Sequence, residues 1–183
     1  VCCGLVSSSS CCSVQAAPTA ALRVPPRVGK RPARRISAGR RRASEATQAT
    51  EVELTGNGRR RRLTPRPGES LLDLLRTHLD LLSPKRGCPP QGQCGACLAI
   101  VDGEPRMTCT VAAERTDGLE VLTLEGVPAG ERESLARAFT VAGAIQCGFC
   151  TPAIVLRAKH LLYRHPSPTR GEIARALDEH LCR

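Results

Sequence analysis

Four cysteines with short, fixed spacing constrain this chain more than any other feature of its sequence. In "CPPQGQCGACLAIVDGEPRMTC" they follow the pattern Cys88-x5-Cys94-x2-Cys97-x11-Cys109. Plant-type [2Fe–2S] clusters use C-x4-C-x2-C and a distant fourth cysteine, so the first gap differs by one residue. Two bridged irons need four thiolates, and a tight loop can supply three of them while a neighbouring strand supplies the last. The spacing therefore predicts an iron–sulfur cluster.

The residues between these cysteines fit a cluster loop, although they leave other kinds of site open. Gly92 and Gly95 allow the backbone to curl so that its N–H groups point at sulfur. Pro89 and Pro90 can absorb the extra residue as a stiff bulge. A zinc site is one alternative, but zinc ribbons prefer two CxxC pairs. Buried free thiols and disulfides are the others, and the tight grouping favours a shared ligand over both.

A second cysteine group lies in the C-terminal part of the chain. Cys147 and Cys150 form a CxxC pair in "QCGFC", and Cys182 is the penultimate residue. A CxxC pair alone is compatible with zinc binding, a redox disulfide or iron ligation. The spacing of this group therefore does not choose among the three chemistries.

The first 50 residues carry most of the net charge of +10 and differ in composition from the rest. They are rich in Ser, Ala, Pro and Arg, contain one acidic residue, Glu45, and lack hydrophobic periodicity. We expect a disordered basic tail that resembles an organelle transit peptide and is dispensable for folding and cluster content. The cysteines of this tail have no assigned role: Cys2, Cys3, Cys11 and Cys12.

The composition of the chain argues against two kinds of partner. The basicity belongs to the tail and aromatic residues make up only 2% of the chain, so no base-stacking nucleic-acid surface is expected. No apolar run approaches the roughly 20 residues of a membrane span. We therefore expect a cytoplasmic protein that binds neither nucleic acid nor membrane.

Residues 51–127 have the pattern of a small α+β domain. "EVELTGNGRRRRLTP" and "CLAIVDGEPRMTC" predict two β-hairpins, which turn at Asn57-Gly58 and Asp102-Gly103. Between them, "GESLLDLLRTHLDLL" places leucines at helical spacing after Ser70, and "GLEVLTLEG" predicts one more strand. The arginines of residues 59–62 are interpreted as a solvated strand edge.

Residues 128–183 predict three helices and no strand, with the domain boundary near residues 126–130. The helices correspond to "RESLARAFTVAGA", "TPAIVLRAKHLLYRH" and "SPTRGEIARALDEHLC". Pro152 suits a first helical turn, and Thr169 with Glu172 forms a capping box. The histidines have no carboxylate or serine at a recognisable spacing and are expected to face solvent or to cap helices: His78, His160, His165 and His180.

Together, "KRGCPPQGQCGACLAIVDGEPRMTC", "AFTVAGAIQCGFCTPAIVLRAKHLL" and "LCR" resemble the iron–sulfur subunit of the molybdenum hydroxylases. This is the family of xanthine dehydrogenase, aldehyde oxidase and carbon monoxide dehydrogenase, and the resemblance spans roughly residues 51–183. It implies a β-grasp, plant-type ferredoxin domain followed by a small all-α helical bundle, each with one [2Fe–2S] cluster. It also implies electron transfer between a large subunit that binds a molybdenum–pterin cofactor and a medium subunit that binds FAD.

The same resemblance implies roles for individual residues. The expected metal ligands are Cys88, Cys94, Cys97 and Cys109 nearer the flavin, and Cys147, Cys150 and Cys182 nearer the molybdenum. Gln146 matches a family glutamine that hydrogen-bonds the pterin, and an ordinary polar residue at a helix end is the alternative. The chain departs from the family at Ala153, where glycine is usual, and at Glu179 and His180, which replace Gly-Asn. These departures bear on the pterin side, because glycine allows close approach.

The family motif continues Cys-Arg-Cys, whereas this sequence ends at Arg183. We therefore expect a C-terminally truncated subunit whose second cluster is incomplete. No catalytic residue is expected, because the bond-making chemistry belongs to a cofactor on a partner chain. The sequence does not distinguish purine from aldehyde substrates. Two rival interpretations are a free-standing ferredoxin-like electron carrier and a structural zinc module.

Overall fold

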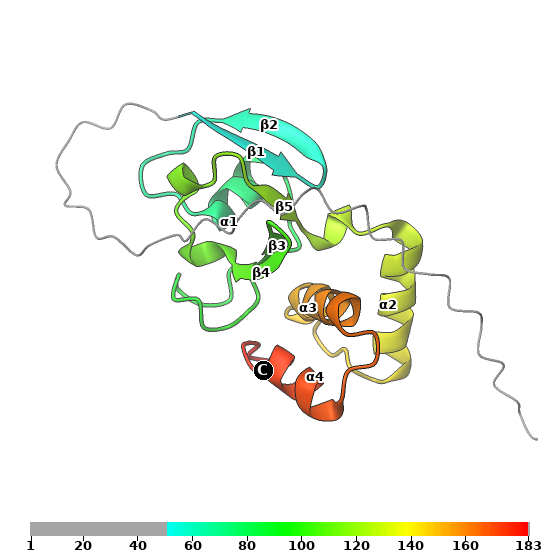
Figure 1. Ribbon diagram of the computed structural model, residues 1–183. Coiled ribbons are helices and arrows are strands. Elements are labelled where there is room, and N and C mark those ends of the chain that lie inside the picture. The colour runs from blue at the N-terminus through cyan, green and yellow to red at the C-terminus, as the bar shows by residue number, and fades with distance from the viewer. Residues whose placement is uncertain (1–50, 183) are drawn as a thin grey trace, which may run out of the picture. The chain divides into compact units, whose positions relative to one another are not determined.

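The computed structural model describes residues 51–182. The basic tail with its four cysteines lies outside the described residues, as does Arg183. Within residues 51–182 a mixed β-sheet is followed by three longer helices (Figure 1). The predicted α+β class is therefore confirmed.

The sheet of the described residues has five strands in the order β2-β1-β5-β3-β4. The strands are β1 (Val52–Gly56), β2 (Arg59–Leu63), β3 (Leu98–Val101), β4 (Glu104–Met107) and β5 (Glu120–Leu122). β1 with β2 and β3 with β4 form antiparallel hairpins. β5 joins the two hairpins, because it runs parallel to β1 and antiparallel to β3. The four arginines of β2 lie exposed at the edge of the sheet, as predicted.

Both hairpins turn where the sequence predicts. Asn57 and Gly58 connect the first pair of strands with φ angles of 49° and 78°, and Asp102 and Gly103 connect the second with 49° and 82°. Positive φ at both central residues is the requirement of a type I′ turn, which Asn-Gly and Asp-Gly meet at low steric cost. These turns fix the register of each hairpin.

The first helix begins where the sequence predicts. α1 (Leu71–Asp73) starts after Ser70, whose side chain accepts a hydrogen bond from the Asp73 backbone N–H at 3.3 Å. The Asp73 carboxylate accepts one from the Ser70 N–H at 3.0 Å, which completes a capping box. The helix continues as a π-helical turn, Leu74–His78.

This helix ends earlier than its leucine pattern suggests. The chain leaves helical geometry after His78, and Asp80 has a φ of 54°. The Leu81 N–H then bonds back to the Leu75 carbonyl at 2.8 Å. As a result, Leu79 and Leu81 fold onto the core as a turn and not as another helical turn. Burial of two large side chains outweighs the helical propensity of leucine at these positions.

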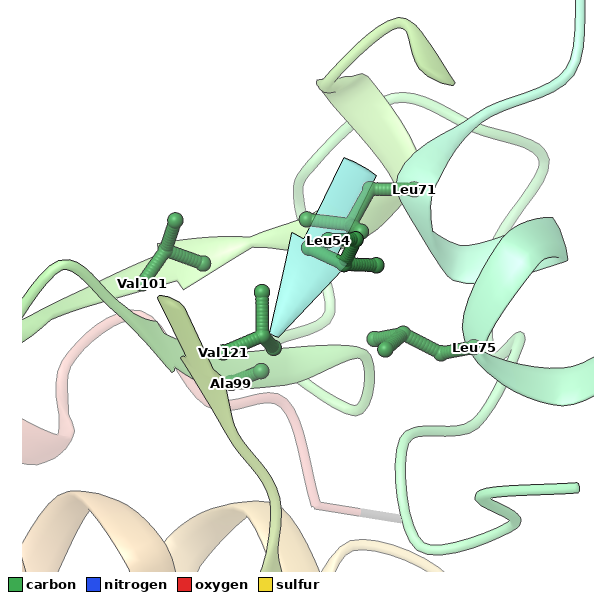
Figure 2. Close-up of a cluster of buried hydrophobic side chains, with 6 residues drawn as sticks. All are labelled: Leu54, Leu71, Leu75, Ala99, Val101 and Val121. Carbon is green, nitrogen blue, oxygen red and sulfur yellow. The ribbon is translucent and has the colours of Figure 1, made fainter. Parts of the chain in front are cut away.

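The main core lies between this helix and one face of the sheet. Its fully buried side chains are all aliphatic: Leu54, Leu71, Leu75, Ala99, Val101 and Val121. Figure 2 shows the two helix leucines facing the strand residues. Because the chain has few aromatic residues, this core depends on close packing of small and branched side chains.

The three predicted helices of the second half are present. They are α2 (Ala129–Val141), α3 (Thr151–Arg164) and α4 (Arg170–Leu177). α3 has proline in its first turn, and α4 begins with the predicted capping box of Thr169 and Glu172. None of the helices described in residues 51–182 is long and apolar enough to cross a membrane.

The helical half is attached to the sheet through α3. Ala153 and Leu156 of α3 pack against Leu98 and Ile100 of β3, together with Val127. α2 and α4 contain no fully buried residue. The second half therefore shares its core with the sheet.

A polar network fixes the chain between the two halves. The Glu125 carboxylate accepts hydrogen bonds from the Ser83 backbone N–H and the Thr123 hydroxyl, each at 2.6 Å. Asn57 accepts from the Thr123 N–H at 2.8 Å and donates to its hydroxyl at 2.9 Å. Burial alone would raise the pKa of Glu125, but hydrogen bonds from Ser83 and Thr123 outweigh burial and lower it. The chain after β5 is thus tied to the first hairpin turn.

Candidate metal centres

The first cysteine group is assembled by the second hairpin and the loop before it. Cys97 directly precedes β3 and Cys109 lies in a 3₁₀ turn after β4. The pairing of these strands brings the two together, and Thr108 donates from its hydroxyl to the Cys97 carbonyl at 2.7 Å. Both thiols are buried against Leu72. A strand neighbour therefore accompanies the loop cysteines, as the spacing predicted.

The loop presents backbone N–H groups to the Cys88 sulfur. Hydrogen bonds from the N–H groups of Gln93, Cys94 and Gln91 lower the pKa of the Cys88 thiol to about 7. They stabilise the thiolate, which is the form that binds metal. An anionic sulfur is thus favoured at this position before any metal is present.

The Cys97 thiol has the opposite electrostatic environment. Burial, together with the neighbouring thiols of Cys109 and Cys94, raises the pKa of Cys97 to about 12. Closely spaced thiols resist ionising together, because each thiolate repels the next. A bound cation removes that penalty, since its charge favours deprotonation of the thiols that coordinate it. The donor set therefore fits a positively charged iron centre.

This difference predicts unequal reactivity of the iron-free folded chain. At pH 7 we expect iodoacetamide to modify Cys88 at least about tenfold faster than Cys97, because the thiolate is the nucleophile. The half-maximal rate at Cys88 should fall near pH 7. Peptide mapping by mass spectrometry measures both sites. In urea the two rates should converge, whereas equal rates in the folded chain would contradict the described loop geometry.

The second cysteine group comes from two segments. Cys147 and Cys150 lie between α2 and α3, and Cys182 follows α4. Burial raises the pKa of Cys150, and the nearby thiols of Cys182 and Cys147 raise it further. The fold therefore brings these three cysteines close enough to interact. Gln146 lies beside them, exposed in the same loop.

The segments that carry the two cysteine groups are in contact with each other. The Leu181 backbone N–H donates to the Cys94 carbonyl at 3.1 Å. Phe149 approaches Gly87, where an added Cβ would lie 3.2 Å from the ring and 2.8 Å from the Cys94 sulfur. Lys85 places its ammonium 5.2 Å from the centre of the same ring, a cation–π contact. No sequence pattern indicates this junction, because its partners lie far apart in the chain.

No three Cys, His, Asp or Glu side chains of residues 51–182 are arranged to hold a single metal ion. A [2Fe–2S] cluster makes a different demand on the protein. Its four thiolates are divided between two irons, so two at each iron suffice. Within the described residues, the first set supplies the four thiols that a binuclear cluster needs, and the second set supplies three of them.

The expectation that all four histidines face solvent or cap helices is wrong for His160 and His180, whose side chains are largely buried. His78 Nε2 lies 3.3 Å from Glu69 Oε2, and His160 Nε2 lies 3.1 Å from the Gly103 carbonyl. Burial lowers the pKa of His160, which the nearby Glu104 carboxylate only partly offsets. His180 is not solvent-facing either, because its ring packs against the first cysteine loop. These contacts are long-range in sequence, so residue spacing could not reveal them.

The fold and the two cysteine groups define an iron–sulfur protein of the [2Fe–2S] type. Residues 123–183 match the family described as "[2Fe-2S] binding domain". The chain is 44% identical over 133 residues to the nicotinate dehydrogenase small FeS subunit of Eubacterium barkeri, a match that covers 72% of this chain and 84% of the relative. The chain belongs to the iron–sulfur subunits of the molybdenum hydroxylase family.

Two further comparisons agree with this membership. The xanthine dehydrogenase iron–sulfur-binding subunit of Escherichia coli O157:H7 is 39% identical over 140 residues, which cover 75% of this chain and 87% of the relative. The crystal structure of quinoline 2-oxidoreductase from Pseudomonas putida 86 matches with a TM-score of 0.69 at 35% identity. That match covers 75% of this chain and 85% of the solved chain. These relatives support a role as the electron-transfer component of an oxidoreductase.

Proposed function

We propose that this chain relays electrons through two [2Fe–2S] clusters, between a molybdenum–pterin centre on a large subunit and FAD on a medium subunit. In this proposal residues 51–127 form a β-grasp, ferredoxin-like domain and residues 128–183 a helical cluster-binding domain. A [2Fe–2S] cluster supplies a carrier that takes up one electron at a time. The observation that carries the proposal is the contact between the two cysteine groups at Cys94 and Leu181.

The first cluster would be held by the four cysteines around the second hairpin: Cys88, Cys94, Cys97 and Cys109. The N–H groups around Cys88 favour negative charge on sulfur. Such hydrogen bonds stabilise the reduced form of a cluster, which carries one more electron. Burial of Cys97 and Cys109 keeps that side of the site away from water.

The second set of ligands in the proposal comprises three of the four thiolates that a [2Fe–2S] cluster needs, Cys147, Cys150 and Cys182, so the second cluster is incomplete in this chain. Gln146 is directed to the pterin. Exposed apolar side chains surround this loop, and Val141 has 84% of its surface accessible. An apolar groove nearby is lined by Leu124, Ala136, Ile145, Pro152 and Val155. Exposed apolar surface beside a redox centre is suited to burial against another protein. This surface supports a partner subunit on the second-cluster side.

The substrate would be chosen by the partner that carries the molybdenum cofactor. Relatives of this chain are named for nicotinate, xanthine and quinoline oxidation. We propose oxidation of purines, aldehydes or related compounds. The rival functions are a free-standing ferredoxin-like carrier and a structural zinc module. The apolar surface favours the assembled enzyme over a free carrier, because that surface would otherwise face water.

Co-expression tests these alternatives. The full chain is produced with candidate molybdenum-binding and flavin-binding chains from the same genome, then purified without oxygen. We expect a reddish-brown complex of three chains and, after reduction, a rhombic [2Fe–2S] electron-resonance signal. A brown chain that elutes alone would favour the free carrier. A colourless chain that contains zinc would favour the structural module.

A further inference from the structure

The imidazole of His180 is the polar group that the proposed function does not explain. Both ring nitrogens have almost no exposed surface, and neither has a hydrogen-bond partner within residues 51–182. A neutral imidazole offers one N–H donor and one acceptor. Native proteins rarely bury such groups without partners, because the lost hydrogen bonds to water are not replaced. The lack of a partner therefore indicates that the ring N–H donates to an acceptor that is not a protein atom.

The ring is held against the first cysteine loop. A Cβ added at Gly95 would lie 2.5 Å from His180 Nδ1 and 3.0 Å from Cγ of the ring. Gly95 follows Cys94 directly and lies two residues before Cys97, with a φ of +72° that favours glycine. The imidazole thus occupies space that any side chain at Gly95 would fill.

Three hydrogen bonds fix the segment that carries His180. Arg157 of α3 donates from Nε to the Ala176 carbonyl at 2.8 Å and from Nη2 to Glu179 Oε2 at 3.0 Å. On the other side of His180, Leu181 is bonded to the Cys94 carbonyl. The imidazole is therefore anchored before and after its position in the chain.

We propose that His180 donates its ring N–H to a sulfur atom of the [2Fe–2S] cluster held by the first cysteine loop, and so raises its reduction potential. The inference rests on the proposed function, which places that cluster at Cys88, Cys94, Cys97 and Cys109. The sulfide and thiolate sulfurs of that cluster would supply a negatively charged acceptor for this otherwise unpartnered donor. Hydrogen bonds to sulfur favour the reduced cluster and raise its potential.

No change of charge on the histidine is required. In either neutral tautomer one ring nitrogen carries a proton. His180 is thus a positioning and tuning residue for the first cluster, although it lies two residues before Cys182 of the second group. An asparagine at this position would also supply a side-chain N–H, whereas leucine would fill similar space without one.

The test is a redox titration followed by electron resonance on the reconstituted full chain. All variants carry Cys147→Ser, so that the signal comes from the first cluster. We expect His180→Leu to lower the ratio of reduced to oxidised cluster about tenfold at fixed potential, the scale of one hydrogen bond to a charged group. That shift corresponds to 59 mV for a one-electron couple. His180→Asn should restore the ratio to within about threefold. The exposed His165→Leu serves as the matched control and should have no effect.

A second measurement does not depend on the leucine variant folding. In a chain labelled with ¹⁵N-histidine, pulsed electron resonance should detect weak nitrogen coupling to the first cluster, and His180→Asn should remove it. An unchanged potential in His180→Leu with an intact signal would overturn the inference. So would loss of the first-cluster signal in both variants, which would make His180 an iron ligand. Absence of any [2Fe–2S] signal in the unsubstituted chain would instead overturn the proposed function.

Discussion

Cys94→Ser is expected to abolish the [2Fe–2S] signal of the first cluster while the chain stays folded. Four thiolates hold such a cluster, and a serine hydroxyl does not replace a thiolate as a soft ligand for iron. Cys94 lies outside the buried cores, and its carbonyl bond to Leu181 does not involve the side chain. Electron resonance after reconstitution with iron and sulfide, together with iron analysis, measures the loss.

The control for this substitution is Cys11→Ser in the basic tail, where no ligand is predicted. It should leave the signal and the iron content unchanged. Circular dichroism of the Cys94 variant should retain the native helical content. A full first-cluster signal in Cys94→Ser would exclude Cys94 from the ligand set and would favour a different grouping of the thiols.

Leu156→Ala is expected to reduce the free energy of unfolding by about 2–5 kcal/mol. Leu156 is 1% exposed and packs against Leu98 and Ile100, where α3 meets the sheet. Removing its side chain leaves a cavity in the core that joins the two halves. Because Cys150 lies at the N-terminus of α3, the second cysteine group should also become more mobile. Urea denaturation measures the stability change.

Leu162→Ala provides a matched control on the same helix. Leu162 is 37% exposed, so its truncation should cost no more than about 1 kcal/mol. Both changes remove the same atoms and both keep a good helix former, which isolates the effect of burial. Equal destabilisation by the two substitutions would contradict a shared core between α3 and the sheet.

The local elements of this fold could be predicted from short stretches of sequence. Asn57-Gly58 and Asp102-Gly103 specify hairpins because few other dipeptides tolerate the positive φ angles of both turns. The capping box of Thr169 and Glu172 marks the start of α4 because the two residues bond each other's backbone. In each case the determining contacts join residues only a few positions apart in the sequence. The pattern can therefore be recognised from the sequence alone.

Features that depend on distant partners could not be predicted in this way. The first helix stops early because Leu79 and Leu81 pack, partly buried, against the core, and helical spacing does not reveal that competing interaction. The sequence favours a solvent-facing or capping position for His180 because its partner surface, Gly95, lies far back in the sequence. Cysteine spacing predicted the first ligand group and the family resemblance implied the second, but neither indicated their contact through Leu181. The ligand assignments themselves stay predictions.

The position of β5 determines when the sheet can be completed during synthesis. The two hairpins are local and leave the ribosome first, whereas β5 joins them and is made last. Until residues 120–122 emerge, the inner edges of β1 and β3 are open to pairing with other chains. The Glu53 N–H of β1 also bonds to the Asp117 side chain, 64 residues away, so this contact closes a segment of chain that contains the first cysteine loop. If iron binds before residues 120–122 have been translated, it therefore binds these thiols while the sheet is still incomplete.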